Sequence, residues 1–332
     1  MAACHVGYQD ATSIYTTNRA CASSLQAITT IADSIALGRI ECGIGAGMES
    51  MTRNYGSRAV PVELWPALRV SPAKAARDCI MAMGVTSENV AERYGITRED
   101  QDMFAAESHR KASRAQKDGL FNKEIICVEV ENPPEEGPGD GTEVKLEKET
   151  ISKDDGIRHN ANVESMAKLK PVFKADGCST AGNSSQISDG AAAVLMMRRT
   201  TSTSLGLTTS VIGKWVSSTV AGVAPDEMGI GPAVAIPRLL AAIGIATEDI
   251  GLWEINEAFA SQALYCIRKL GLDMEKVNTK GSGIALGHPL GATGARQVSS
   301  LLPEMERLGS ELGVVSMCVG TGMGMASLFV RE

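Results

Sequence analysis

The chain has 332 residues, of which 44% are hydrophobic and 21% charged, and its net charge is −7. These values are typical of a globular protein with room for two domains, and they exclude a disordered chain or a small peptide scaffold. The negative charge argues against a general nucleic-acid binder, because neutralising phosphates needs clustered lysine and arginine. No apolar run approaches the ~20 residues of a membrane-spanning helix.

Eight cysteines are scattered along the chain without tight spacing, and the first residues, MAACHVGYQD, do not resemble a secretory signal. This pattern favours an intracellular protein with free thiols over a disulfide framework. We expect all but one or two of the cysteines to be small buried apolar side chains. A zinc site is not expected, because the chain has no C-x-x-C or H-x-x-x-H pair.

Two elements are predicted near the start of the chain. Apolar residues at helical spacing predict a helix over residues 22–37, which Gly38 ends. Residues 40–47, IECGIGAG, predict a short buried strand that enters a glycine turn.

A second helix is predicted over residues 98–118. Thr97 is a favoured N-cap residue, Asp100 follows three residues later, and Gly119 suits the end of the helix. His109 lies inside this helix among charged residues, so we expect it to be solvated at the surface.

The later segments alternate between loops and short apolar runs. Residues 131–149 are rich in proline, glycine and acids, which predicts an exposed excursion or hairpin without a chemical role. Residues 177–197 begin as a glycine and serine loop and end as a buried apolar segment, and residues 211–220 predict a further strand. Short buried strands alternating with helices indicate an α/β architecture.

The pattern Asn-x-Ala-x-Ala-Ser occurs twice, at residues 18–23 and 256–261. Each copy precedes an apolar helical run and, farther on, a short strand with a glycine-rich turn. The pattern favours two related halves over a chance match in an Ala/Ser-rich chain. At one repeated position the first half has Cys21 and the second has Phe259, so a single reactive half is expected.

Three further features bear on the chemistry. Cys21 lies where a helix begins, and the helix dipole and free N–H groups there favour thiolate. His288 lies in the glycine-dense loop GSGIALGHPLGATGAR, and Cys318 precedes glycines whose N–H groups could bind an oxyanion. A nucleophilic cysteine, a histidine that accepts its proton and a second cysteine can together perform acyl transfer. A dinucleotide site at residues 43–47 is disfavoured by the glycine spacing.

Taken together, several segments resemble the thiolase family, most closely its peroxisomal 3-ketoacyl-CoA branch, from about residue 10 onward. The matching segments are Asn18-Arg19-x-Cys21, Asn256-Glu257-Ala258-Phe259, Gly287-His288-Pro289-x-Gly291, Cys318-x-Gly320-x-Gly322, Lys168-Leu169-Lys170-Pro171 and Thr180-Ala181-Gly182-Asn183.

The resemblance implies a thiolase fold, with two related βαβαβαββ halves in a layered αβαβα arrangement and a loop domain over the site. It implies a truncated N-terminal domain at residues 1–51 and 188–208, a loop domain at 52–187 and a C-terminal domain at 209–332. Because few residues precede the nucleophile motif, the first half is expected to lack strands and to expose apolar faces and sheet edges.

The resemblance also implies the catalytic roles. Cys21 would attack the keto carbon of 3-ketoacyl-CoA and become an acyl thioester, and His288 would take the thiol proton. Cys318 would protonate the departing acetyl-CoA carbanion and then deprotonate incoming CoA. Asn256, through a bound water, and His288 would hold the thioester oxygen, while the N–H groups of Cys21 and Gly320 would form a second oxyanion hole.

By the same resemblance CoA is a co-substrate, and no permanently bound cofactor or metal is expected. The expected CoA contacts are Met83, Arg158, Ala181, Ser185 and Phe259. The expected partners are acyl-CoA, CoA and a second copy in a homodimer, but not nucleic acid or a membrane. A peroxisomal location is expected from the branch alone, since no targeting signal is visible and the C-terminal residues 330–332 are not of the S-K-L type.

Two departures and two alternatives qualify this assignment. Ser24 and Ser282 stand where the family usually has glycine, so each hydroxymethyl group is expected to crowd a tight backbone. A thiolase-fold protein with little or no turnover, acting at most as an acyl-CoA binder, is one alternative. A ketoacyl synthase on the same fold is the other, and Cys318 disfavours it.

Overall fold

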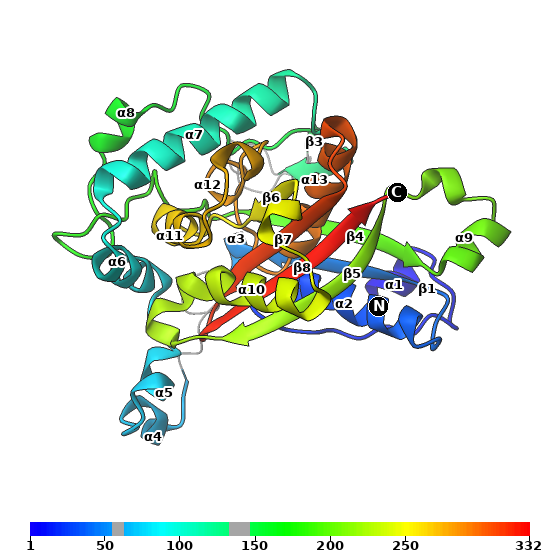
Figure 1. Ribbon diagram of the computed structural model, residues 1–332, viewed down its shortest axis with the longest axis horizontal. Coiled ribbons are helices and arrows are strands. Elements are labelled where there is room, and N and C mark those ends of the chain that lie inside the picture. The colour runs from blue at the N-terminus through cyan, green and yellow to red at the C-terminus, as the bar shows by residue number, and fades with distance from the viewer. Residues whose placement is uncertain (55–62, 133–146) are drawn as a thin grey trace, which may run out of the picture.

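The computed structural model describes residues 1–54, 63–132 and 147–332 (Figure 1). Its strands are β1 (Cys42–Ser50), β2 (Val128–Asn132), β3 (Glu147–Ile151), β4 (Asp189–Met197), β5 (Gly213–Gly222), β6 (Leu252–Ile255), β7 (Leu312–Val319) and β8 (Met323–Arg331). Its helices are α1 (Ala2–His5), α2 (Ser23–Ala36), α3 (Met51–Asn54), α4 (Pro66–Arg69), α5 (Lys74–Asp78), α6 (Met83–Tyr94), α7 (Arg98–Lys117), α8 (Val163–Ala167), α9 (Arg199–Ser204), α10 (Gly231–Ile243), α11 (Ala260–Leu270), α12 (Gly283–Leu286) and α13 (Thr293–Leu308). Short 3-10 turns are η2 (Thr208–Ser210), η3 (Pro225–Ile230), η4 (Thr247–Asp249) and η5 (Met274–Lys276).

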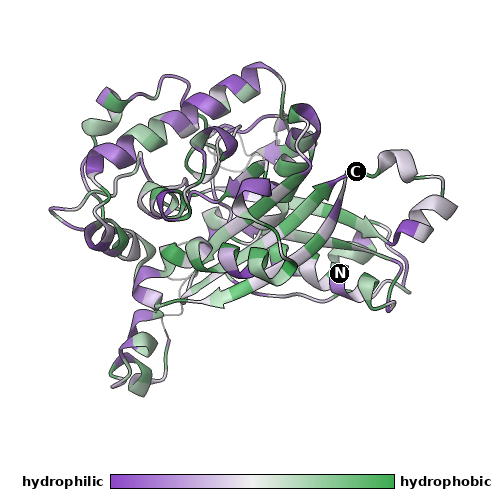
Figure 2. Ribbon diagram, in the orientation of Figure 1, coloured by the Kyte–Doolittle hydropathy of each residue, from purple (hydrophilic) through white to green (hydrophobic). Residues whose placement is uncertain are grey.

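A four-stranded sheet in the order β5-β8-β7-β6 forms the centre of the molecule. β6 runs parallel to β7, whereas β8 is antiparallel to both β7 and β5. Side chains alternate between its faces: Val314 and Leu328 pack in the cluster that includes α10 and α11, and Val315 and Met317 pack in the cluster that includes α2 and α13. Both faces of β7 and β8 are therefore buried, and these two strands are green along most of their length in Figure 2.

Helices α2 and α13 form the next layer, and they pack against each other. Leu25 and Ile28 of α2 share one hydrophobic cluster with Val298 and Leu301 of α13. One face of β4 reaches the same cluster through Ala192, Val194 and Met196. The order of layers is thus α10 and α11, the central sheet, the pair α2 and α13, and then the antiparallel pair β1–β4.

Within the part of the chain that the structure describes, the opposite face of the β1–β4 pair is open. Ile44, Met48 and Leu195 on this face are 41%, 69% and 62% exposed. Among the described residues no further strand joins either outer edge of the pair, whereas β7 and β8 are flanked by β6 and β5. These exposed side chains and free edges agree with the expectation that the first half exposes an apolar face and sheet edges.

The two related halves are present, but the repeated sequence pattern pairs the wrong helices. α2 leads directly into β1 and α13 leads directly into β7, and each of these strands has an antiparallel partner, β4 or β8. α11, which follows Asn256, leads instead into η5 and α12. The counterpart of α2 is therefore α13, and the Asn-x-Ala-x-Ala-Ser match is a local similarity between helices in different places.

The segment between β1 and β4 contributes α6, α7 and α8, which gather at one end of the central sheet beside α11 and α12 (Figure 1). α7 begins as predicted: Thr97 and Asp100 form a reciprocal capping box, and Gly119 after the helix has a φ of +69°. The predicted hairpin is represented by the antiparallel strands β2 and β3, while the residues between them, 133–146, lie outside the described chain.

The prediction that His109 is solvated is wrong. Its side chain is 3% exposed, and its Nδ1 accepts the backbone N–H of Arg158 at 3.1 Å. Burial, followed by the positive charge of Arg158, lowers the pKa of His109 to about 4, so the ring is neutral. Charged neighbours in the sequence did not predict exposure here, because α7 presents this face to the chain that returns at residues 156–158.

The predicted strands are found with shifted bounds, but two of them are less buried than expected. Residues 40–47 correspond to β1, residues 211–220 to β5 and the end of 177–197 to β4. In β1 and β4 exposed residues alternate with partly or fully buried ones, because only one face of this pair is covered.

All eight cysteines are free thiols, in agreement with the sequence. The expectation that nearly all of them are buried is wrong, because Cys4, Cys42 and Cys127 are exposed and Cys79 and Cys178 are partly exposed. Only Cys21, Cys266 and Cys318 are buried. Within the described chain, no helix combines the length and the apolar character needed to cross a membrane.

Candidate active site

Cys21 lies in a tight turn directly before α2. Ala20 has a φ of +43°, an uncommon backbone conformation for a residue other than glycine, and Ser23 N–H donates to the Ala20 carbonyl. The turn buries Cys21, which is 8% exposed, and directs its sulfur toward two backbone N–H groups, its own and that of Gly320. Burial outweighs these two donors and raises the pKa of Cys21 to about 11, so the resting group is a thiol that needs a base.

His288 is the base that the structure offers. The ring is 3% exposed, and burial, with a smaller effect of the Arg296 charge, lowers the pKa of His288 to about 3. A neutral imidazole can accept a proton at physiological pH, which an imidazolium cannot. Nδ1 of His288 lies 2.6 Å from Thr293 Oγ1, and Asn256 Nδ2 lies 3.3 Å from each ring nitrogen.

Asn256 is held rigidly between β6 and α11. Its backbone N–H donates to the Ser316 carbonyl of β7, and its own carbonyl accepts from Gln262 Nε2 at 2.8 Å. Its side-chain Oδ1 is buried and has no hydrogen-bond partner among the described residues. A buried polar atom without a partner usually bonds an ordered water or a ligand, which suits the water-mediated role expected for Asn256.

Cys318 occupies the end of β7, fully buried. It packs with Met228, Ala258 and Phe259, and Met83 covers this cluster. Burial is the main cause that raises the pKa of Cys318 well above its ordinary value, and the neighbouring Cys21 thiol adds to it. Cys318 is therefore a protonated thiol close to Cys21, as an acid that delivers a proton should be.

The five residues expected to be catalytic come from four separate places and form two groups: Cys21, Cys318 and Gly320 are neighbours in one, and Asn256 contacts His288 in the other. Cys21 precedes α2, Asn256 follows β6, His288 follows α12, and Cys318 and Gly320 lie at the turn from β7 to β8. These elements are joined by the central sheet and the α2–α13 layer, so the arrangement depends on the fold and not on one loop.

Of the expected CoA contacts, Met83 and Phe259 lie beside Cys318 in one cluster. The Ser185 N–H donates to the Ala258 carbonyl at 3.0 Å, which sets Ser185 next to Phe259. Arg158 and Ala181 are exposed, on the segment between β1 and β4.

Sequence inspection did not identify Thr293 and Arg296 as site residues, although both belong to the quoted loop 281–296. Thr293 contacts the imidazole of His288, and Arg296 Nη2 donates to Ser282 Oγ at 3.2 Å. Ser282 is buried and hydrogen-bonded, as is Ser24, whose Oγ accepts the N–H of Ala295. The hydroxyl groups of Ser24 and Ser282 therefore accept hydrogen bonds from residues of α13, whereas the sequence led us to expect that they would crowd the backbone.

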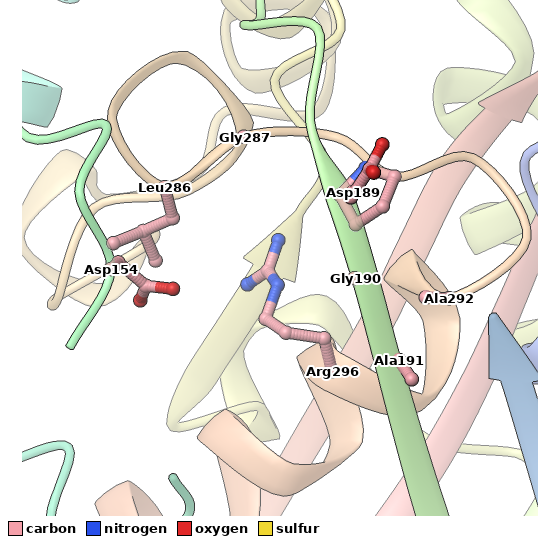
Figure 3. Close-up of a pocket in the computed structure, with 9 residues that line it drawn as sticks. Asp154, Asp189, Gly190, Ala191, Leu286, Gly287, Ala292 and Arg296 are labelled. Atoms are coloured by element: carbon pink, nitrogen blue, oxygen red, sulfur yellow. The ribbon is translucent and has the colours of Figure 1, made fainter. Parts of the chain in front are cut away.

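A hollow that is partly open to solvent adjoins the histidine loop (Figure 3). Gly287 and Pro289, on either side of His288, line it, but His288 itself does not. Figure 3 shows the Arg296 guanidinium pointing into it from α13, with Asp154 and Asp189 at its rim. Neither Cys21 nor Cys318 lines this hollow.

Comparison with known proteins identifies the family. Residues 1–200 match the family model for the thiolase N-terminal domain, and residues 209–331 match that for the thiolase C-terminal domain. The chain is 50% identical to 3-ketoacyl-CoA thiolase 2, peroxisomal, of Arabidopsis thaliana, over 100% of this chain and 70% of that protein. It is also 50% identical to the peroxisomal 3-ketoacyl-CoA thiolase of Homo sapiens, over 95% of this chain and 71% of that protein.

A solved structure leads to the same conclusion. The dimeric peroxisomal thiolase of Saccharomyces cerevisiae matches with a TM-score of 0.88 and 44% identity, over 100% of this chain and 80% of that chain. Sequence and fold agree, and the chain belongs to the thiolase family.

Proposed function

We propose that this chain is an acyltransferase that cleaves 3-ketoacyl-CoA with CoA, giving acetyl-CoA and an acyl-CoA shortened by two carbons, in peroxisomal fatty acid β-oxidation. The observation that carries the proposal is the buried pair of neighbouring thiols, Cys21 and Cys318, in a chain that also buries the neutral imidazole of His288 in contact with Asn256. The relatives at about 50% identity are peroxisomal 3-ketoacyl-CoA thiolases, which supports both the reaction and the location.

The first half-reaction forms the acyl-enzyme. His288 takes the proton of Cys21 as its sulfur bonds to the keto carbon of the substrate, and the carbonyl oxygen gains the negative charge. Collapse of this adduct breaks the bond between the keto carbon and the α-carbon. The electron pair leaves on acetyl-CoA as an enolate, and Cys318 supplies the proton that makes acetyl-CoA.

The second half-reaction returns the enzyme to its starting state. The Cys318 thiolate takes the thiol proton of incoming CoA, and the CoA sulfur attacks the thioester on Cys21. The Cys21 sulfur then leaves and recovers its proton from His288. Atoms and protons balance over the cycle, and neither an oxidant nor a permanently bound cofactor is needed.

Two groups of donors stabilise the developing oxyanions in this scheme. The backbone N–H groups of Cys21 and Gly320 converge on the Cys21 sulfur and form one oxyanion hole. His288 and a water bound by the unpartnered Oδ1 of Asn256 act at the other. Loss of one such donor typically costs about 3 kcal/mol of transition-state stabilisation.

The CoA chain would reach the thiols past Met83, Phe259 and Ser185, which gather next to Cys318 and Ala258. We place Arg158 and Ala181 farther along the same CoA molecule. The proposal includes the domain division 1–51 with 188–208, 52–187 and 209–332, and assembly as a homodimer, which the dimeric yeast structure supports.

A second candidate function is acyl-CoA binding with little or no turnover. The open face of β1–β4 favours it, because the domain that carries Cys21 has an exposed apolar face with Met48 and Leu195 on it. A domain with an incompletely covered sheet could hold Cys21 less firmly than catalysis requires.

A thiolysis assay separates the two functions. Acetoacetyl-CoA and a longer 3-ketoacyl-CoA are each incubated with CoA and purified protein of known oligomeric state. CoA-dependent loss of substrate, with an acyl group on Cys21 detected by mass spectrometry before CoA is added, is the expected result. Cys21→Ser should abolish both signals and Cys42→Ser, a change at an exposed cysteine, should abolish neither. Binding of acyl-CoA without turnover or a Cys21 adduct would leave the second candidate.

A further inference from the structure

We propose that Ser24 is a positioning residue, which fixes the histidine loop against the helix of the nucleophile through two hydrogen bonds. This inference deepens the proposed thiolase reaction and rests on it. Ser24 Oγ accepts the backbone N–H of Ala295 at 2.9 Å, and the Ser24 N–H donates to the Gly291 carbonyl at 3.2 Å. Ser24 is 0% exposed, so water does not compete for either bond.

Helix α13 begins without a cap of its own. Its N-cap residue is Ala292, and no side chain of the cap accepts a hydrogen bond from the first turn. The first N–H groups of a helix have no partner within the helix and need an acceptor from elsewhere. Ala295 is the third residue of α13, and an N-cap serine usually bonds this N–H. Ser24 supplies the missing acceptor from α2, so the starts of the two helices are tied together.

Cys21 and His288 both lie within a few residues of the groups that form these two hydrogen bonds. Cys21 precedes Ser24 by three residues, and His288 precedes Gly291 by three. Thr293, in the first turn of α13, contacts His288 Nδ1 at 2.6 Å. A shift of α13 relative to α2 would therefore change the position of the imidazole relative to the Cys21 sulfur.

The backbones around these two hydrogen bonds are in close contact, so the neighbouring residues cannot move to compensate for such a shift. A Cβ added at Gly294 would lie 2.6 Å from the Leu25 nitrogen, and one added at Gly47 would lie 2.0 Å from the Gly291 oxygen. Glu49 Oε2 also accepts the Gly291 N–H at 3.1 Å. Gly291 is thus held through both its N–H and its carbonyl, and it carries the end of the histidine loop.

The variant Ser24→Ala tests the proposal, because it removes Oγ and keeps Cβ. We expect kcat to fall by about 10- to 100-fold, since small displacements of catalytic groups have effects of this size. The KM for 3-ketoacyl-CoA should stay within about twofold, because the changed bond lies outside the CoA contacts. Alkylation of Cys21 by iodoacetamide at neutral pH, followed by peptide mass spectrometry, should slow by about tenfold, because the imidazole assists it.

Thr29→Val is the matched control. Thr29 is a buried residue of the same helix, and its hydroxyl makes a cross-domain hydrogen bond of 2.9 Å to Ser218 of β5. Its loss removes a comparable bond away from the histidine loop, so a lower Tm with unchanged kcat and unchanged alkylation is expected. If Ser24→Ala behaves in the same way as this control, Ser24 is merely structural and the proposal is overturned.

Two further measurements keep the test decisive. If Ser24→Ala does not fold, Ser24→Gly removes the same hydroxyl and is assayed in its place. In the unchanged protein the Ala295 amide should exchange with solvent as slowly as amides in the middle of α13, and fast exchange would contradict the hydrogen bond. If the unchanged chain has no thiolase turnover, the proposed function fails, yet the alkylation rates still decide the role of Ser24.

Discussion

The Nδ1 atom of His288 and the hydroxyl oxygen of Thr293 lie 2.6 Å apart, and the same hydroxyl lies 3.1 Å from the Pro289 carbonyl oxygen. The hydroxyl has a single proton. Donation of that proton to the Pro289 carbonyl leaves the hydroxyl oxygen to accept N–H from Nδ1, and this arrangement satisfies both contacts. Nε2 then has the free lone pair, so Thr293 selects the ring tautomer in which Nε2 is the base.

Replacement of Thr293 with valine should remove this control. We expect kcat/KM to fall by about 10- to 100-fold. General base catalysis by His288 accelerates the reaction, and part of this acceleration is lost when the ring adopts the wrong tautomer. Thr293→Ser keeps the hydroxyl and should retain most of the activity. Steady-state kinetics of the two variants check this prediction, and equal losses in both would contradict the assigned tautomer.

Stability should depend on pH through His109. The pKa of His109 in the folded chain is about 4, below the ordinary value of 6.5, so between these values the unfolded chain binds more protons. The free energy of unfolding therefore falls as the pH falls from about 6.5 to about 4, by up to about 1.4 kcal/mol per pH unit for this group. His288, with its pKa lowered to about 3, acts in the same direction.

The variant His109→Asn isolates this contribution, since the amide oxygen can replace Nδ1 as acceptor for the Arg158 N–H but does not titrate. Urea unfolding at several pH values should show a shallower loss of stability below pH 6.5 in the variant. Above pH 7 both proteins should give parallel curves, which serves as the internal control. An unchanged slope in the acid range would mean that His109 is already charged in the folded chain.

The elements that were predicted correctly are those whose signals are local. Thr97 and Asp100 mark the start of α7 because both partners of the capping box lie within four residues. His288 and Cys318 were found because glycine-rich motifs surround them, and Cys21 because it lies where a predicted helix begins, although nothing in their spacing tells which of them will meet. The fold brings them together through β7, α2 and α13.

The features that were missed depend on contacts between distant segments. The burial of His109 requires knowing that residues 156–158 pass over α7, and the exposure of Ile44, in a strand predicted to be buried, requires knowing that no described element covers that face. Ser24 was noticed as a departure from the motif, but its partner Ala295 is 271 residues away. Sequence patterns do not predict contacts between residues that lie so far apart along the chain.

A buried ion pair joins the segment between β1 and β4 to the C-terminal half. Lys280 Nζ lies 3.1 Å from Glu124 Oε2, with side chains 2% and 8% exposed, and the ammonium lies 5.3 Å from the centre of the Phe121 ring. Removing one partner leaves the other charge buried without a counter-charge. Lys280→Met should therefore lower the free energy of unfolding by about 3 to 5 kcal/mol.

A double-mutant cycle tests this pair. Combining Lys280→Met with Glu124→Met should restore much of the lost stability, because no unpaired charge then stays buried. Lys123→Met is the matched control: Lys123 bonds Glu306 at 2.7 Å, but these side chains are 69% and 54% exposed. Loss of such a surface pair should cost at most about 1 kcal/mol. Additive effects of the two buried substitutions, measured by urea unfolding, would refute the coupling.

The open face of β1–β4 should make this 332-residue chain prone to self-association. Ile44 and Leu195 are direct cross-strand partners on that face, and Met48 lies on it four residue pairs farther along. An exposed apolar sheet face with two free edges is a typical site of association between chains. Leu195→Lys places a charge at its centre and should lower the binding of a hydrophobic dye and the fraction of large species in light scattering.

The same substitution should leave the free energy of unfolding within about 0.5 kcal/mol, because Leu195 is 62% exposed and gives up little burial. Leu37→Lys is the control: Leu37 is 67% exposed at the end of α2, and its substitution should change neither measurement. If both variants reduce association equally, net charge and not the sheet face is the cause. If Leu195→Lys unfolds the chain, Leu195 is buried in solution, and the β1–β4 face is covered there.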